Sequence, residues 1–473
     1  MKNIINKIGV LTVVFSLFIV SCETVDFGDE NVNPNSPTSK KTDALLTDAM
    51  TYMPSVVSAV DPNYYVQTIS DVTYSDGSRY DQEDWSWNGL YVGPLKNLQE
   101  ILDLNENFPS EVTGGGSNGN QKAAAHIMMA YYYLHITDRW GYAPYSEALQ
   151  GSDNVAPKFD SVESIYASLL SNLDAAMGMM DNGGLNGDIL FGGNMNGWSV
   201  MANTLKMRIA LRMADVNPSM AASVFNAAYN SGVIGQGGDL HYPYLTSDAF
   251  DNPWQDRFQT RYDYVVSELF IDYLKANGDP RLPYMADGTP ISNGTEYVGL
   301  EYGLESPAVL ETLLSGIDGR IIYDGTQQGG WIATYAEVCF AMAEANERGW
   351  TTVGDTLTWL KLGIQASCER WGVPSATAAS FAASTTLGSN PMETIAMAKW
   401  TDMFCQGYEA WTEWRRLDFP KLSAPVAAIT GSDVPVRHGY GSLVPSQNKA
   451  SYDAAVAAQG PDNQDTKLWW DTK

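Results

Sequence analysis

Cysteine is scarce in this chain of 473 residues, which contains only Cys22, Cys339, Cys368 and Cys405. Cys22 lies just after an N-terminal apolar run, so three cysteines remain for the body of the chain. These three are odd in number and lie within segments of helical spacing, which argues against a disulfide framework. We expect three buried thiols instead.

Basic residues are also few. The chain has 28 Lys and Arg against 55 Asp and Glu, a formal net charge of −27. Nucleic-acid-binding proteins need Lys and Arg to displace counterions from phosphates, so the composition argues against nucleic acid as a partner. The four histidines, at positions 126, 135, 241 and 438, lack the spacing of a zinc site. The acidic balance is typical of a solvent-exposed protein surface.

Long apolar runs are missing after residue 20. The run at residues 8–20 follows Lys2 and Lys7 and is shorter than the roughly 20 residues that a helix needs to cross a bilayer. This pattern predicts a secretory signal peptide over residues 1–21. The sequence Ile-Val-Ser-Cys that ends at Cys22 resembles the bacterial lipobox, whose cysteine becomes the lipidated first residue. We therefore expect Cys22 to carry the lipid, the alternative being an ordinary signal peptide with a chance cysteine.

The segment after the apolar run has no apolar period. Residues 22–41 are rich in Asn, Asp, Pro, Ser and Thr, a composition that gives an extended chain rather than a packed element. We expect a flexible, lipid-anchored tether here, followed by a single domain over residues 42–473.

Helical spacing organises that domain. Apolar residues recur three and four positions apart over residues 121–139, 162–180, 198–213, 331–348, 356–371 and 392–416. Loops rich in Gly, Asn and Pro separate these segments, for example at 182–197 and 288–303, and few segments alternate as strands do. We expect a predominantly α fold in which tetratricopeptide-like helix pairs form a scaffold with long, irregular, loop-rich insertions. The sequence has no clean repeat at a fixed period.

Charged residues within the helical segments allow two interpretations. Arg208, Arg212, Arg415 and Arg416 could bind an acidic ligand, but a helical arginine in an acidic protein more often pairs with a neighbouring carboxylate, which we expect here. Glu337 and Glu413 could act as catalytic acids, although sequence spacing cannot place two carboxylates across a sugar.

Aromatic residues within polar loops are the better candidates for a binding site, because flat rings beside amides or carboxylates bind the apolar faces of sugars, and peptides use similar surfaces. Three segments qualify, at 74–87, 241–264 and 325–331. The residues that we expect to contact a ligand are Tyr74, Tyr80, Trp85, Tyr244, Trp254, Arg261, Tyr262 and Trp331. The alternative for each ring is packing beneath a long loop.

A metal or cofactor is not expected. Carboxylates and amides at 181–196 could hold a calcium ion, but the segment has no EF-hand pattern and a plain loop is the simpler interpretation.

Several blocks along the chain resemble the SusD/RagB family of outer-membrane lipoproteins of the Bacteroidetes. They are NVNPNSPT at 31–38, TDRWGYAPYSEA at 137–148, PKFD at 157–160, ANTLKMR at 202–208, DPR at 279–281, EAWTEWRR at 409–416, PVR at 435–437 and WWD at 469–471. Their order along the whole chain carries the resemblance more than any single block does. One departure follows PVR, where His438-Gly439-Tyr440 stands in place of the Tyr-Pro and acidic residue that many relatives have.

The resemblance implies a function. Family members capture a glycan or an oligopeptide at the cell surface and act as a lid on a SusC-type TonB-dependent outer-membrane transporter, without catalysis. The resemblance thus places this chain at the outer membrane, lipid-anchored and facing the exterior. Two alternatives stay open: a surface glycan hydrolase on a helical scaffold, and a structural or adhesive lipoprotein.

Overall fold

The computed structural model describes residues 40–473, except for 82–83, 248, 308, 324–328 and 430–432. Thr42–Lys473 form one compact unit. The predicted signal peptide, Cys22 and nearly all of the predicted tether lie outside the described residues, so the predicted boundaries stay predictions.

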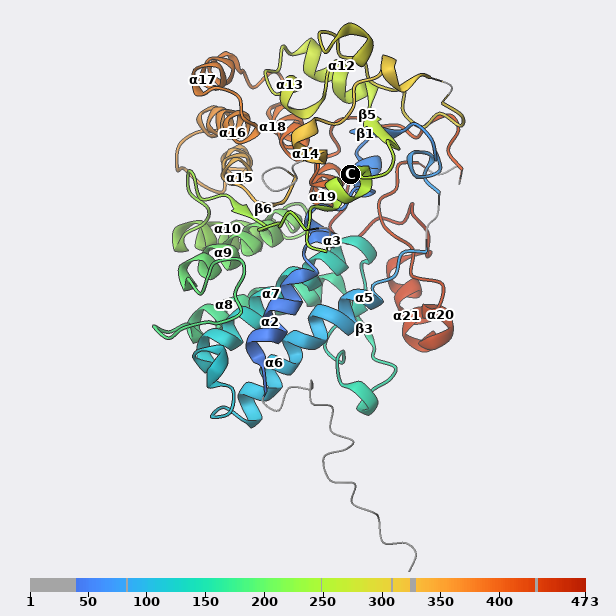
Figure 1. Cartoon of the computed structure of the whole chain (residues 1–473). Helices are drawn as coiled ribbons and strands as arrows, with labels where there is room; N and C mark the ends of the chain where they lie inside the picture. Colours follow the sequence, from blue (N-terminus) through green and yellow to red (C-terminus); the bar gives the residue numbers. More distant parts are fainter. Residues whose placement is uncertain (1–39, 82–83, 248, 308, 324–328, 430–432) are drawn as a thin grey trace, which may run out of the picture. The chain divides into compact units, whose positions relative to one another are not determined.

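Helices dominate the described chain (Figure 1). The α-helices are α2 (Thr42–Thr51), α3 (Pro54–Val57), α4 (Pro62–Tyr65), α5 (Asn88–Leu90), α6 (Lys96–Asn107), α7 (Asn118–Trp140), α8 (Val162–Met179), α9 (Met195–Arg212), α10 (Pro218–Ser231), α11 (Pro253–Phe258), α12 (Glu268–Ala276), α13 (Leu282–Met285), α14 (Gly319–Ile322), α15 (Tyr335–Glu347), α16 (Thr356–Trp371), α17 (Ser375–Ser384), α18 (Pro391–Asp402), α19 (Gly407–Leu417), α20 (Val444–Gln447) and α21 (Lys449–Gln459). Short helical turns are η3 (Gly77–Arg79), η4 (Tyr91–Leu95), η5 (Thr113–Gly115), η6 (Gly151–Asp153), η7 (Pro290–Ser292) and η8 (Glu311–Leu313). The prediction of a predominantly α fold is confirmed.

The strands form short antiparallel pairs. They are β1 (Ile69–Asp71) with β5 (Tyr264–Val266), β2 (Ala143–Pro144) with β3 (Phe159–Asp160), and β4 (Leu240–His241) with β6 (Trp331–Ala333). Each pair joins segments that are separated in sequence, and β1–β5 and β4–β6 close loops of more than 80 residues. The strands therefore fasten loops rather than build a sheet core.

Local signals explain where several helices begin. The Ser161 hydroxyl accepts a hydrogen bond from the Ser164 amide and caps α8, and the Asp355 carboxylate does the same for α16 through Thr358. Such caps satisfy amide groups that have no partner inside the helix. At the other end of α16, Gly372 has a φ of 98°, a left-handed conformation that glycine adopts without strain. Helix α16 accordingly matches its predicted range of 356–371.

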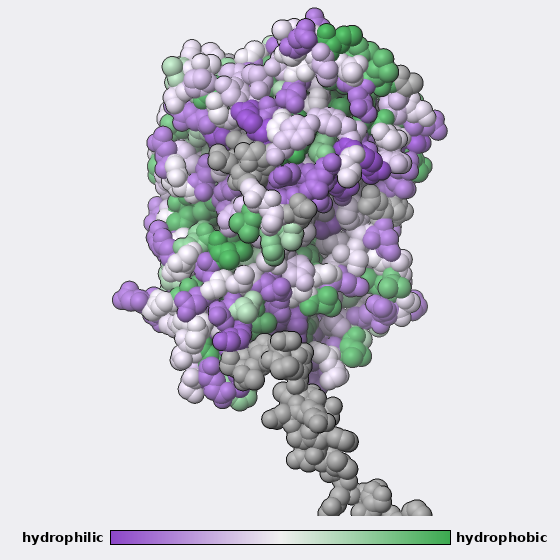
Figure 2. Space-filling model, viewed as in Figure 1, coloured by the Kyte–Doolittle hydropathy of each residue, from purple (hydrophilic) through white to green (hydrophobic). Residues whose placement is uncertain are grey.

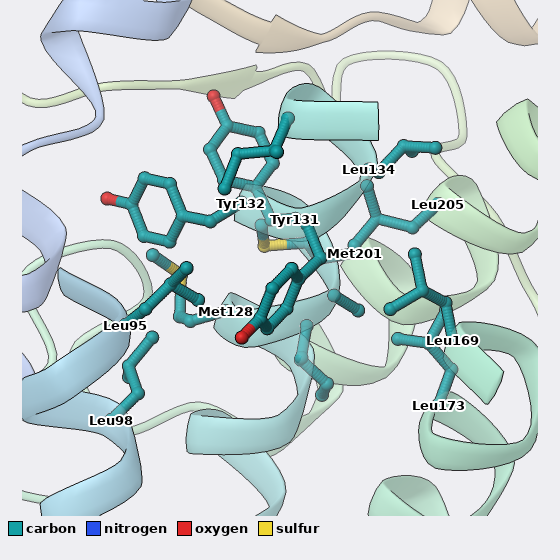
Figure 3. Packing of buried hydrophobic residues seen from close by; sticks show 14 of the residues in the cluster. Leu95, Leu98, Met128, Tyr131, Tyr132, Leu134, Leu169, Leu173, Met201 and Leu205 are labelled. Atoms are coloured by element: carbon teal, nitrogen blue, oxygen red, sulfur yellow. The ribbon is translucent and has the colours of Figure 1, made fainter. Parts of the chain in front are cut away.

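Successive helices pack against one another, α6 on α7, α7 on α8, α8 on α9 and α9 on α10, and later α15 on α16 and α18. Helix α7 lies at the centre of the first group and is buried along most of its length. Figure 3 shows Leu98 of α6, Met128 of α7 and Leu169 of α8 meeting in one cluster, together with Met201 of α9. Each of these side chains is almost fully buried, and burial of one such side chain stabilises the fold by about 1.5–3 kcal/mol.

Two predicted helices are wrong in part. Residues 331–333 form strand β6, and the Thr334 hydroxyl caps α15 one residue later. The predicted helix at 392–416 is two helices, α18 and α19, because Cys405 between them has a φ of 69°. At Gly407, a Cβ atom would lie 2.8 Å from the Asn63 backbone nitrogen. Close packing of α4 against the start of α19 therefore fixes the break, which helical periodicity could not reveal.

The block at 137–148 packs against the segment that departs from the family pattern. The Trp140 indole nitrogen donates a hydrogen bond to the Gly439 carbonyl (3.0 Å), and the His438 amide donates to the Arg139 carbonyl (2.9 Å). Both Trp140 and His438 are fully buried. This contact ties the end of α7 to the C-terminal part of the chain.

The predicted buried thiols are confirmed, since Cys339, Cys368 and Cys405 are free and buried. Burial raises the pKa of the Cys339 and Cys368 thiols to about 12, so both stay protonated and unreactive at neutral pH.

A buried network of ion pairs joins α9, α15, α18 and α19. At its centre, Glu344 of α15 accepts hydrogen bonds from Lys399 of α18 (3.1 Å) and Arg416 of α19 (2.7 Å). Glu413 of α19 binds Lys399 (2.6 Å) and Arg212 of α9 (2.9 Å). The Arg416 and Lys399 charges hold the pKa of the Glu344 carboxyl well below its usual range, against the opposing effect of burial. A carboxylate so placed has a large desolvation cost that its fixed cations must offset.

Gly407→Ala is expected to lower the free energy of unfolding by about 1–3 kcal/mol, because the new methyl group would overlap backbone atoms of Pro62 and Asn63. Urea denaturation checks this value. Gly178→Ala is the control, since a Cβ there meets no atom within 4 Å in the exposed last turn of α8, and it is expected to stabilise by up to about 1 kcal/mol. Equal effects of the two substitutions on the free energy of unfolding would contradict the close contact between Gly407 and the backbone of Asn63.

Glu344→Gln is expected to lower the free energy of unfolding by about 3–5 kcal/mol, because it leaves Lys399, Arg416 and Arg348 without a shared buried anion. The matched control is Glu347→Gln on the exposed side of the same helix, where a change within about 0.5 kcal/mol is expected. Denaturation curves of the two variants at neutral pH make the comparison. If Glu344→Gln lowered the free energy of unfolding no more than Glu347→Gln does, the network would contribute little to stability.

Candidate functional site

The pairing of β1 with β5 brings together two of the three predicted loop segments. Asp71 lies opposite Tyr264, so Tyr74, three residues after β1, and Arg261, three residues before β5, leave the pair at the same end. The Arg261 guanidinium lies 5.0 Å from the centre of the Tyr74 ring, a distance at which a cation is attracted to a ring face. Tyr74 is 61% exposed.

The residue after Arg261, Tyr262, lines a pocket. Its volume is about 520 Å³, within the range of small-ligand sites. We call it the Tyr262 pocket; it is lined by Tyr262, Val265, Asp287, Gly288, Pro290, Gly294, Glu311, Thr312, Leu314, Gly316 and Tyr323. Two tyrosines, two carboxylates and one threonine thus surround a small apolar floor.

Glycines shape the Tyr262 pocket. A Cβ atom at Gly316 would lie 2.7 Å from the Tyr262 hydroxyl, and one at Gly288 would lie 2.3 Å from the Gly294 carbonyl oxygen. Both distances are shorter than real contacts, so a larger residue at either position would displace the pocket wall. The Tyr262 ring is held from behind by Phe258, with ring centres 5.0 Å apart and an angle of 75°.

Burial keeps the polar groups of the pocket in defined protonation states. It raises the pKa of the Tyr262 phenol, and the neighbouring Tyr323 and Asp287 raise it further, so this hydroxyl is a hydrogen-bond donor at neutral pH. Burial and the nearby Asp318 charge raise the pKa of the Asp287 carboxyl above its ordinary value. Tyr323 is 64% exposed and offers a ring to a ligand.

Tyr244 and Trp331 lie elsewhere, where β4 pairs with β6, and both rings pack near His241. Tyr244 is 6% exposed and its hydroxyl is 2.7 Å from that of Ser58. Trp331 is half-buried and packs edge-on against His241, with ring centres 4.6 Å apart. Trp254 is fully buried in a hydrophobic cluster with Phe258. The sequence analysis expected rings that face a ligand, whereas the structure uses Tyr244 and Trp254 in packing.

Tyr80 and Trp85 lie apart from both groups. Tyr80 is fully buried, and its hydroxyl accepts a hydrogen bond from the Gln67 amide (2.7 Å). Trp85 is half-buried and stacks on His438, with ring centres 4.8 Å apart and an angle of 7°. One face of Trp85 is therefore already covered, and Tyr80 has no exposed ring to offer.

Of the predicted residues, Tyr74 and Arg261 thus contact each other, and the next residue in the chain, Tyr262, lines the pocket. Sequence reasoning missed Tyr323, Asp287 and Glu311, which share the Tyr262 pocket. Tyr323 had a local signal, since it is an aromatic residue between an apolar pair and Gly325. Asp287 and Glu311 had no such signal in the sequence, because their positions depend on how loops that are distant in sequence pack together.

The expected pairing of helical arginines with carboxylates is confirmed for three of the four. Arg208 binds Glu337 (2.6 Å), Arg212 binds Glu409 (2.6 Å) and Arg416 binds Glu344 and Glu413. Arg415 differs: it donates to the backbone carbonyls of Asp138 (2.7 Å) and Val436 (2.9 Å), and its guanidinium lies 3.7 Å from the Trp411 ring centre.

The carboxylates that were considered as catalytic acids belong to this same network. Glu337 is bound by Arg208, and Glu413 by Arg212, Lys399 and Arg416. The Arg416 and Lys399 charges hold the pKa of the Glu413 carboxyl far below its ordinary value, although burial opposes this. A group held as an anion in this way is unsuited to donate a proton at neutral pH.

The loop considered for calcium uses its carboxylates locally. Asp188 accepts hydrogen bonds from the amides of Leu190, Phe191 and Gly193 and from the Trp198 indole. Within the described part of the chain, no group of three or more His, Cys, Asp or Glu is placed to hold a metal ion.

Among the residues that the structure describes, every helix is too short or too polar to span a bilayer. The surface in Figure 2 carries apolar side chains at several separate places between polar ones.

Comparison with known proteins connects this fold to a family. The family model described as starch-binding and associating with the outer membrane, SusD-like, matches residues 34–441. A solved chitin-binding protein is 26% identical, with a TM-score of 0.80 over 92% of this chain and 100% of that one. A Bacteroidetes SusD-like protein (23% identity, TM-score 0.79) and a SusD homologue from Bacteroides fragilis (22%, 0.78) each match over 92% of this chain and their whole length.

The comparison with curated proteins found no match. The helical scaffold agrees with the tetratricopeptide-like fold of the SusD-like structures, as predicted. With a family model that covers most of the chain and solved relatives that share its fold over 92% of its length, the protein belongs to the SusD-like family of nutrient-binding proteins associated with the outer membrane.

Proposed function

We propose that the protein captures a glycan in the Tyr262 pocket and delivers it, without chemical change, to a SusC-type TonB-dependent outer-membrane transporter. The observation that carries the proposal is the pocket itself, in which the exposed Tyr323 ring stands beside the Tyr262 phenol and two carboxylates. An aromatic ring packs against the apolar face of a sugar, and carboxylates and phenols form hydrogen bonds with its hydroxyl groups.

The charge of the pocket favours neutral glycans. Asp287 and Glu311 are its charged lining residues, so a uronic acid or a sulfated sugar would meet like charge in a protein of net charge −27. A solved relative of 26% identity is described as chitin-binding, and chitin is an uncharged polymer. An oligopeptide is the competing ligand class, and the same binding experiment separates the two.

The delivery step depends on features outside the described residues. A lipid on Cys22 and a tether over 22–41 would hold the protein at the outer surface of the outer membrane, close to a transporter. The support for this part is membership of the family together with the sequence around Cys22. The delivery step is tested by copurification: the transporter is expected to copurify with the tagged protein from membranes. It is not expected to copurify with the Cys22→Ser variant.

Binding is expected to be saturable for neutral oligosaccharides and to fall about ten-fold in Tyr323→Ala, because one ring contact is worth about 1–1.5 kcal/mol. Calorimetric titration against panels of neutral oligosaccharides, acidic oligosaccharides and oligopeptides measures it. Phe108→Ala is the control, as this ring is also partly exposed but lies outside the pocket. Equal affinity of Tyr323→Ala and the unaltered protein would remove the Tyr262 pocket from the proposal.

No product is expected to form when the bound oligosaccharide is incubated with the protein, because the pocket carboxylates bind hydroxyl groups rather than exchange protons across a glycosidic bond. Chromatography of the mixture over a day provides the measurement. Product formation that disappears in Glu311→Gln or Asp287→Asn would instead establish the alternative, a surface hydrolase.

A further inference from the structure

A second, smaller cavity lies between α7, α9 and α19, beside β6. Its volume is about 50 Å³. A site needs roughly 10–15 Å³ to hold one water molecule, so this cavity has room for a small ion or a few waters and not for a sugar. His135, Arg139, Arg208, Trp331, Gln406 and Glu409 are among its lining residues.

Arg139 brings a positive charge to this cavity without an anionic partner of its own. It is 7% exposed, and its guanidinium donates to His438 Nδ1 (3.1 and 3.2 Å) and to His135 Nε2 (3.0 Å). Burial and the Arg139 charge hold the pKa of both imidazoles well below the ordinary value, so the two histidines are neutral. The rings of Trp140 and Tyr408 cover the guanidinium at 4.1 and 4.3 Å.

The carboxylates near Arg139 are committed to other cations. Asp138 accepts hydrogen bonds from Arg212 and Tyr166, and Glu409 binds Arg212 at 2.6 Å. Asp61, the other acidic group whose field reaches Arg139, pairs with Arg257 at 2.9 Å.

The ion-pair network around these carboxylates is balanced without Arg139. In the described part of the chain, the network contains six carboxylates and six cations, namely Asp138, Asp215, Glu337, Glu344, Glu409 and Glu413 with Arg208, Arg212, Arg348, Lys399, Arg416 and Lys473. Of the four charged residues that line the cavity, Asp138, Arg139, Arg208 and Glu409, Arg139 is the one for which the structure records no ion pair among the described residues.

Two further hydrogen-bond donors line the cavity without an acceptor. The Gln406 amide nitrogen and the Trp331 indole nitrogen are buried and have no partner among the described residues. Gln406 is 4% exposed and stands at the start of α19. Leaving a buried donor unpaired costs about 1–3 kcal/mol, so two such donors at one cavity indicate an acceptor between them.

We propose that the cavity binds a small monovalent anion of the size of chloride, held by Arg139, the Gln406 amide and the Trp331 indole. An anion satisfies both donors and gives Arg139 an anionic partner, whereas a cation would do neither. Water would satisfy the donors but would leave Arg139 with neutral hydrogen-bond partners only. The site is separate from the Tyr262 pocket and independent of glycan binding.

The first test is the thermal unfolding of the full chain in detergent at constant ionic strength, with sodium gluconate replaced stepwise by sodium chloride or bromide. Gluconate is too large for the cavity. A saturable rise of the midpoint by about 2 °C is expected with chloride and with bromide. A midpoint that is the same in gluconate and in both halides would show that water suffices, and the proposal would fail.

Two variants locate the site. Gln406→Glu supplies a carboxylate in place of the anion and is expected to remove the halide response while unfolding in gluconate no earlier than the unaltered protein. Trp331→Phe keeps a ring but removes one donor, and is expected to raise the half-saturating bromide concentration about five-fold. Gln447→Glu, on the exposed surface, is the charge-matched control and should leave the response unchanged.

Bromide anomalous scattering from crystals grown in sodium bromide gives the position directly. A peak within hydrogen-bond distance of Arg139 and Gln406 supports the site. A halide response that persists in Gln406→Glu, or bromide peaks confined to the surface, would overturn it.

Discussion

The buried ion pairs between α9, α15, α18 and α19 are the constraint on which the rest of this fold depends. Buried charges are costly unless each has a partner in good geometry, so Arg212, Glu344 and Glu413 permit only one mutual arrangement of the four helices. Apolar packing tolerates small shifts, whereas a chain of shared carboxylates does not. The network therefore sets the register of the scaffold, and the apolar clusters on either side supply most of the stabilisation.

Long loops on this scaffold are held in defined positions by short strand pairs. The pairs β1–β5 and β4–β6 fasten segments from the first and the middle parts of the chain to each other. Each pair comprises only two or three residues per strand, yet it decides which side chains come together. Tyr74 meets Arg261 because β1 and β5 are antiparallel, and Trp331 meets His241 because β4 and β6 are. The position of the candidate site thus follows from strand pairing rather than from helix packing.

Sequence reasoning succeeded where local signals decide the structure. Helix α16 was predicted with its bounds because Asp355 begins it and Gly372 ends it. It failed at 392–416, where the break at Cys405 is imposed by the packing of α4. Among the aromatic residues, Tyr74 and Trp254 looked alike in sequence, each in a polar loop, but one is 61% exposed and the other fully buried. That difference depends on which distant segment covers the loop, so no local pattern could predict it.

Buried arginines have three kinds of partner in this chain. The burial of basic side chains also has a consequence for ligand binding. Arg212 neutralises carboxylates, Arg415 binds backbone carbonyls between two tryptophan rings, and Arg139 rests on neutral histidines. Among the described residues, nine of the 26 basic side chains are buried, against ten of the 48 acidic ones. The core thus takes about a third of these basic residues but only about a fifth of the acidic ones. The surface that a ligand meets is therefore more strongly acidic, in proportion, than the composition alone suggests, and long-range electrostatics there oppose polyanions before any contact forms. A pocket of phenols and carboxylates on such a surface is suited to uncharged ligands, whose affinity depends on ring contacts and hydrogen bonds and changes little with salt.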